Sequence, residues 1–212
     1  MKNEGRRTIL AALASEYRIR VSRLAPWTSS ELQHLSGAVE DLATLMGGSA
    51  RFRWEVRRLF VSKLSLDTSM AAVAFPVLGV VYFKRASWGN PPELKWQTVH
   101  ELAHIWDMGK RLRLSRGLKG TTGSTYGRFV FQLPIPFKYE PGGRWLETRA
   151  PPLNALEDWA DSVATYVYPG HAESLSPPRS GGPRLISPVR WNYVREQMQV
   201  QLPYPAQWIP YF

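Results

Sequence analysis

The stretch QTVHELAHIWD, residues 97–107, places two of the chain's four histidines four positions apart, with a glutamate directly after the first. Residues four apart on an α-helix lie one above the other, so His100 and His104 can direct both imidazoles at one point. Apolar residues cover most of the remaining circumference, which predicts a buried helix. The polar side chains of such a helix need hydrogen-bonding or metal partners, because unpaired polar groups are costly inside a protein.

The pattern H-E-x-x-H is typical of a zinc site with a built-in base. A divalent cation would satisfy both imidazoles together, and Glu101 would lean to one side of the cation without binding it. We therefore predict His100 and His104 as zinc ligands and Glu101 as a general base. The alternative is a pair of core histidines that hydrogen-bond to neighbouring groups.

A third ligand is needed, because catalytic zinc usually has three protein ligands and an open water position. The stretch NALEDWADSVATYVYP, residues 154–169, predicts a second helix with Glu157 and Asp161 on one face. We expect Glu157 to bind the metal and Asp161 to accept the free ring N–H of a liganding histidine. The alternatives are a capping box between Asn154 and Glu157 and a solvated helix charge at Asp161.

The two motifs together, H-E-x-x-H and a downstream E-x-x-x-D, resemble the gluzincin class of zinc metallopeptidases. The stretch EDWADSVATYV, residues 157–167, is also similar to the ligand helix of lethal-factor-type toxin peptidases and of peptidases that cleave phage repressors. The resemblance covers these two helices. It implies one Zn²⁺ per chain, a peptide or protein substrate, and hydrolysis by a metal-activated water with Glu101 as the base.

The chain departs from the lethal-factor pattern at one position. Sequences of that type carry a tyrosine seven residues before the ligand glutamate, where it can stabilise the oxyanion, and Ala150 stands there in this chain. Four other residues are candidate oxyanion stabilisers: Tyr126, Tyr166, Tyr168 and His171.

The predicted fold class is α+β. We expect a zincin-like single domain in which a small mixed or antiparallel sheet packs on the active-site helix and on the second ligand-bearing helix. An N-terminal helical segment covers residues 1–25, the metallopeptidase domain covers 26–200, and a tail rich in proline and aromatic residues covers 201–212.

Two stretches upstream of the motif predict strands. Residues 51–66 alternate apolar and basic side chains, and residues 77–85, VLGVVYFKR, are β-branched and aromatic. We expect the second strand to be the sheet edge along which a substrate backbone adds. A helix capped by Ser29 or Ser30 precedes them, and residues 110–126, which are basic and Gly-rich, predict a loop.

The composition bears on the kind of protein, on its location and on the residue types that could bind a metal. The chain is 44% apolar and 21% charged, which is ordinary for a soluble domain, and no apolar run approaches the ~20 residues that span a bilayer. A short signal-like stretch at residues 8–14 follows basic residues, but it is at the lower limit of a signal peptide, so we expect a cytoplasmic monomer. The absence of cysteine leaves His, Asp and Glu as the metal ligands.

Two other functions compete with the peptidase. One is a non-catalytic protein stabilised by zinc, which a fourth protein ligand such as His171 or Asp107 would favour. The other is a basic module that binds nucleic acid or an acidic partner, because the net charge is +10. No helix-turn-helix pattern, Gly-rich phosphate loop or zinc-finger spacing supports the latter.

Overall fold

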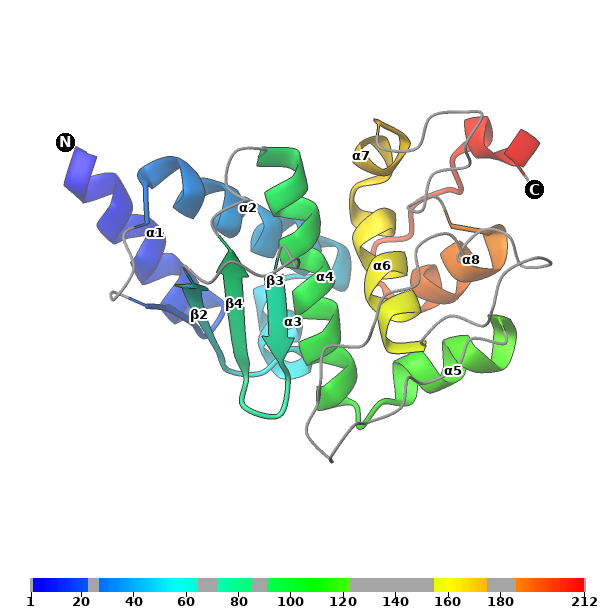
Figure 1. Ribbon diagram of the computed structural model, residues 1–212, viewed down its shortest axis with the longest axis horizontal. Coiled ribbons are helices and arrows are strands. Elements are labelled where there is room, and N and C mark those ends of the chain that lie inside the picture. Colours follow the sequence, from blue (N-terminus) through cyan, green and yellow to red (C-terminus); the bar gives the residue numbers. More distant parts are fainter. Residues whose placement is uncertain are drawn as a thin grey trace.

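The computed structural model describes residues 2–22, 27–64, 72–84, 91–122, 155–174 and 186–211. These residues form an α+β fold that is mostly helical and contains one four-stranded mixed sheet (Figure 1). In chain order the elements are α1 (Lys2–Glu16), β1 (Ile19–Val21), α2 (Ser29–Met46), α3 (Ser49–Glu55), β2 (Leu59–Leu64), β3 (Ala72–Phe75), β4 (Val80–Lys84), α4 (Pro91–Gly109), α5 (Arg113–Thr122), α6 (Ala155–Val167), α7 (Pro169–Ser174), α8 (Pro188–Gln197) and the 3-10 helix η2 (Ala206–Tyr211). The predicted α+β class is confirmed.

Helix α4 stands in the middle of the molecule, with the sheet and α1 to α3 on one side and α5 to α8 on the other (Figure 1). It packs on α2 and β3 on its first side and on α6 on its second. Within the described ranges, no helix is both long and apolar enough to cross a membrane. Helix α2 also meets the second half, because the Gln199 and Val200 N–H groups donate to the Leu45 carbonyl.

The sheet has the order β1-β2-β4-β3, in which β3 pairs antiparallel with β4 and the other pairs are parallel. The prediction that strand 77–85 forms the edge is wrong, because β4 pairs with β2 and with β3. The edge beside α4 is β3, whose four residues are too short a run to signal a strand. Pro76 belongs to the turn that joins β3 to β4, and Val77 and Leu78 belong to the same turn.

The prediction of one strand over residues 51–66 is wrong in its first half, which forms α3. Phe52 and Val56 are both buried and lie four apart, so the apolar pattern that suits a strand also suits a helix. Gly47, with φ +100°, ends α2, and Gly48 begins α3. Two consecutive glycines therefore separate two helices rather than a helix and a strand.

The cap of α2 lies one residue before the first of the two predicted caps, Ser29 and Ser30. Thr28 is the N-cap: its hydroxyl accepts from the Glu31 N–H, and the Glu31 carboxylate accepts from the Thr28 N–H. The same carboxylate pairs with Lys63 on β2 at 2.6 Å. This capping box therefore also ties the helix to the sheet, while the buried side chains of α2, which include Leu32, Leu35, Val39 and Leu42, face the core.

Residues 113–122 form helix α5, so the predicted loop over 110–126 is wrong in that part. The buried carboxylate of Asp107, at the end of α4, accepts hydrogen bonds from the N–H groups of Leu114 and Ser115. These are two of the first N–H groups of α5, which otherwise lack partners. The cap comes from outside the helix, so the local composition of this stretch does not reveal it.

The C-terminal segment folds back on the second half of the molecule. Trp208 is buried and lies against the ring of Trp191 on α8, and Tyr204 contacts both rings. The Leu202 N–H donates a 2.6 Å hydrogen bond to the Tyr166 hydroxyl on α6. The tail thus covers the side of α6 that faces away from α4.

A buried ion pair joins α8 to α6. The Arg190 guanidinium donates to both carboxylate oxygens of Asp158, at 2.7 and 3.3 Å, and both side chains are almost fully buried. Removing one member of such a pair leaves a buried charge without compensation, which is more costly than losing the pair itself.

We therefore expect Asp158→Asn to lower the free energy of unfolding by about 3–5 kcal/mol, measured by urea denaturation. Glu196→Gln removes an exposed charge from α8, the helix that carries Arg190; it is the control and should change the free energy of unfolding by no more than about 0.5 kcal/mol. The double variant Asp158→Leu with Arg190→Met should recover most of the loss. An unchanged midpoint in Asp158→Asn would contradict this role of the pair.

Candidate metal centre

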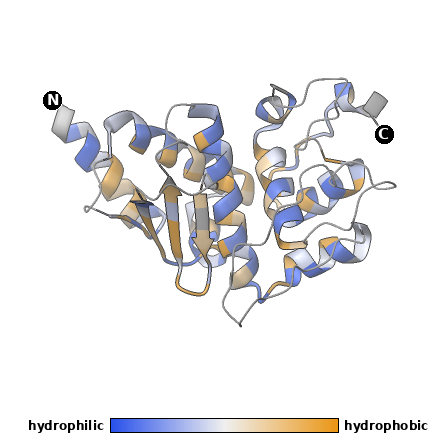
Figure 2. Cartoon of the chain, in the orientation of Figure 1, coloured by the Kyte–Doolittle hydropathy of each residue, from blue (hydrophilic) through white to orange (hydrophobic). Residues whose placement is uncertain are grey.

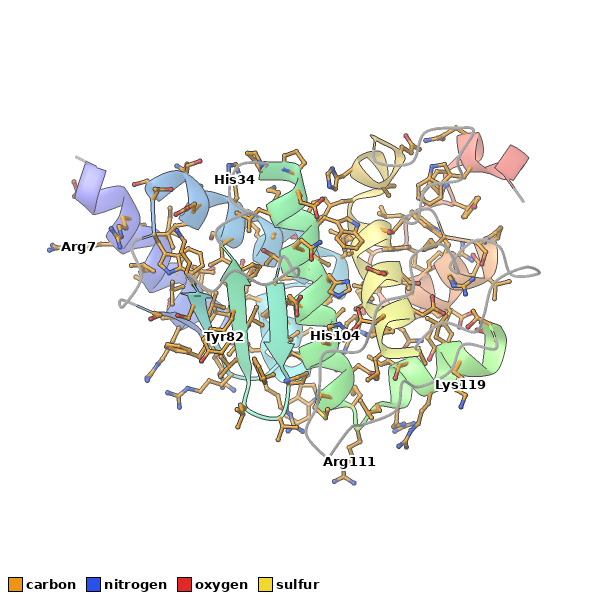
Figure 3. All side chains as sticks on the ribbon, viewed as in Figure 1. Arg7, His34, Tyr82, His104, Arg111 and Lys119 are labelled. Atoms are coloured by element: carbon orange, nitrogen blue, oxygen red, sulfur yellow. The ribbon has the colours of Figure 1, made fainter. Side chains whose placement is uncertain are left out.

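Close packing of α4 on α6 creates the site. Ala103 on α4 and Ala160 and Ala164 on α6 are completely buried, and their small side chains let the two helix backbones approach. The Trp159 indole N–H donates a 3.1 Å hydrogen bond to the Ala103 carbonyl across this contact. His104, labelled in Figure 3, lies between the two helices.

The side chains of His100, His104 and Glu157 converge there, as the sequence predicted. The Nε2 atom of His100 lies 3.1 Å from Nε2 of His104 and 3.3 Å from Oε2 of Glu157, and His104 Nε2 lies 3.4 Å from Glu157 Oε1. Zinc bonds of about 2.0–2.1 Å in a tetrahedron put neighbouring ligand atoms roughly 3.3 Å apart. The contacts to Glu157 involve both of its carboxylate oxygens, and each separation is close to that spacing, so these three residues could hold a metal ion. We call the three side chains the ligand triangle.

Asp161 orients one of the imidazoles. Its Oδ1 atom lies 2.8 Å from Nδ1 of His100, so the ring donates its Nδ1–H to the carboxylate. This tautomer leaves a lone pair on Nε2, which is the atom that faces His104 and Glu157. The indole of Trp96 stacks on the same ring, with the centroids 5.5 Å apart. His100 is thus held on its edge and on its face in the orientation that a metal ligand needs.

The charges of this cluster are strongly coupled. Burial alone would lower the pKa of His100, but Asp161 and Glu157 raise that pKa well above its ordinary value. Burial opposes ionisation of Glu157, yet the imidazoles of His104 and His100 hold its pKa far below its ordinary value. Two negative charges therefore occupy a buried space, and a divalent cation would offset them. Protonated imidazoles would offset the same charge, which is what the core-histidine alternative requires.

Glu101 lies outside the triangle, facing the sheet. It is only 3% exposed, and its Oε2 atom has no hydrogen-bond partner among the described residues. The Ala74 backbone N–H on β3 donates to the carboxylate. Burial raises the pKa of Glu101, and the nearby His100 and His104 lower it, with a net upward shift. A buried carboxylate oxygen without a partner is costly and calls for an explanation, and Asp107, which caps α5, has one such oxygen as well.

The three described candidates for oxyanion stabilisation bond elsewhere. The Tyr166 hydroxyl accepts from Leu202, and the Tyr168 hydroxyl donates to Asp41 at 2.7 Å. His171 lies 3.0 Å from the Glu93 carboxylate at the start of α4. His171 is not part of the group of His100, His104 and Glu157 that could hold a metal ion. Tyr126, Ala150 and Asn154 lie outside the described residues.

The sequence analysis missed two groups that contact the side chains of the site, the Trp96 indole and the Ala74 N–H. Trp96 lies four residues before His100, and that spacing alone could have indicated the stacking contact. The Ala74 N–H is a backbone group on a strand that was not predicted, so no side chain signalled it. Asp107, the other suggested fourth ligand, caps α5 instead.

No protein-family model matches the chain. No curated protein matches it, and no solved structure does. The function proposed below is therefore argued from the side chains of the site alone.

Zn²⁺ added to the protein should bind in a one-to-one ratio, and Glu157→Ala should lose most of this binding because the third ligand is gone. Asp161→Ala should keep the stoichiometry at saturation but weaken the affinity about 10–100-fold, because His100 loses its orienting partner. Metal content is measured by mass spectrometry after dialysis, and affinity by competition with a coloured chelator.

Glu93→Gln is the matched control, because this carboxylate, on α4 with His100 and His104, also pairs with a histidine, but outside the triangle. It should bind zinc as the wild type does. Equal zinc content in Glu157→Ala and the wild type would exclude Glu157 as a ligand.

Proposed function

We propose that the protein is a zinc-dependent peptidase with a zincin-like fold, in which His100, His104 and Glu157 hold one Zn²⁺ ion. Two imidazoles and one carboxylate form a ligand set of catalytic zinc sites, which leaves a fourth position open. The mixed sheet beside the motif helix supports the zincin-like fold. The observation that carries the proposal is the buried Glu101 carboxylate, whose Oε2 atom lacks a described partner beside the ligand triangle.

When bound, zinc supplies an activated water and a Lewis acid for the scissile carbonyl. Glu101 accepts the proton of the attacking water and returns it to the leaving amine. Burial raises the pKa of Glu101, which makes its protonated form more populated and suits it to this return step. The Ala74 N–H holds the carboxylate in place while the proton moves.

The edge strand β3 is the proposed position for the substrate backbone. On the side away from β4 it pairs with no other described strand, so an extended peptide can add to it. Ala74 lies in this strand and touches Glu101 through its N–H. A peptide laid along β3 would therefore pass close to the proposed base.

A second candidate function is a zinc ion that only pins α4 to α6. It is favoured by one observation: Tyr166, Tyr168 and His171 all bond outside the cluster, so none of them offers a group to a developing oxyanion. The two functions share the metal ligands and differ in the need for Glu101. A structural zinc site requires no base.

Glu101→Gln separates the two. If the protein is a peptidase, the variant should bind zinc like the wild type and lose about 10²–10⁴-fold in turnover, because glutamine cannot accept a proton. The assay is digestion of a proteome-derived peptide library by the zinc-loaded protein, read by mass spectrometry of the new termini. Glu93→Gln, on the same helix but paired with His171, should cleave at the wild-type rate.

Cleavage that is identical in Glu101→Gln and the wild type would exclude Glu101 as the base. Stoichiometric zinc with no cleavage by the wild type would favour the structural role. In that case zinc should still raise the melting temperature of both proteins, because a ligand that binds only the folded state stabilises it.

A further inference from the structure

The turn that joins β3 to β4 exposes two adjacent aliphatic side chains. Val77 is 76% exposed and Leu78 is 74% exposed, and Figure 2 shows this turn as an apolar tip at the end of the sheet. The turn is firmly held: the Phe60 N–H donates to the Gly79 carbonyl, and a Cβ at Gly79 would lie 2.8 Å from the Arg58 carbonyl oxygen. The apolar pair is therefore presented on a fixed support.

Arginines in an unusual backbone conformation surround this tip. Arg18, Arg57 and Arg111 have φ values of 58°, 64° and 56°, and each follows the end of a helix, α1, α3 or α4. Glycine or asparagine is the usual residue at such a position, because other side chains are strained there. All three arginine side chains are exposed. Leu112, the residue after Arg111, also has a positive φ of 60°, so this conformation is not confined to cations, but at all three arginine positions it carries an exposed positive charge.

These positions lie at one end of the molecule. The Leu59 N–H donates to the Arg18 carbonyl where β1 and β2 start, and the Arg57 guanidinium donates to the Gly109 carbonyl at the end of α4. Figure 3 shows Arg111 at the same extremity as the β3–β4 turn. The exposed Arg58 directly precedes β2, beside Gly79. We call this group of Arg18, Arg57, Arg58, Arg111, Val77 and Leu78 the basic tip.

Helix capping alone does not account for the arginines. A cation near a helix C-terminus is favoured by the helix dipole, but a basic residue within the last turn would serve without backbone strain. The last turns of α1 and α4 contain none. Glu55, the acidic residue at the end of α3, is paired with Lys110 and does not neutralise the tip.

We propose that the basic tip docks on an anionic lipid bilayer, with Val77 and Leu78 entering the interfacial layer and the arginines contacting lipid phosphates. An anionic bilayer offers an apolar layer for the two aliphatic side chains and negatively charged phosphates for the arginines. A nucleic acid would meet the arginines but offers no pocket for two aliphatic side chains at the apex. The proposal is independent of the peptidase activity and of the metal.

The first test is flotation of the full chain with vesicles of phosphatidylcholine alone, or of equal parts phosphatidylcholine and phosphatidylglycerol. The wild type should float only with the anionic vesicles. Val77→Ser with Leu78→Ser should bind them about tenfold more weakly or worse, because the inserted apolar surface is lost. Val189→Ser with Val200→Ser removes two partly exposed valines from the region of α8, away from the tip, and should bind like the wild type.

The second test uses Arg18→Asn with Arg111→Asn, which keeps a residue that favours positive φ and removes two charges. Its melting temperature should be no lower than that of the wild type. Its affinity for the anionic vesicles should fall about fivefold per charge, or roughly 25-fold in total. Wild-type affinity in this variant would overturn the proposal, and so would wild-type affinity in the serine variant.

Absence of flotation with the anionic vesicles would also overturn the proposal. So would tight, salt-dependent binding of the wild type to duplex DNA that needs the arginines and does not need Val77 or Leu78, since the tip would then be a nucleic-acid surface.

Discussion

The contact between α4 and α6 is the constraint on which the rest of the molecule depends. Alanines at the crossing allow the two backbones to approach, and the indole of Trp159 bonds to a carbonyl of α4 across the gap. Without this approach the Asp161 carboxylate would not reach the His100 ring at 2.8 Å. The site is therefore a product of helix packing, and its polar residues are held by the apolar contact around them.

This packing carries an electrostatic cost that shapes the site. Two carboxylates and two imidazoles are brought together between the helices, where water is largely excluded. Such a group is tolerated only when its charges are balanced, by protons on the rings or by a cation between them. A chain selected only for stability would be better served by apolar residues at these positions.

The sequence predicted the two helices of the site, α4 and α6, better than it predicted α3, α5 and β3. Residues 97–107 and 154–169 carry strong helical periodicity and polar stripes, so both helices and the meeting of His100, His104, Glu157 and Asp161 could be anticipated. Helix α3 was misassigned because the spacing of its buried residues fits two periods. Helix α5 depends on a cap from Asp107, and the edge strand β3 depends on pairing with β4. When a helix cap or a pairing strand comes from another part of the chain, the local sequence pattern of a segment does not reveal it.

The distance in sequence between the two halves of the site has a consequence for biosynthesis. His100 and Asp161 are 61 residues apart, and at about 5–20 residues per second the ribosome needs roughly 3–12 s to add that length. During this interval α4 can bury its first side against α2 and β3, while its histidines face no carboxylate from α6. The group of His100, His104 and Glu157 cannot assemble until α6 has emerged, so a cation that needs all three side chains could be bound only after that point.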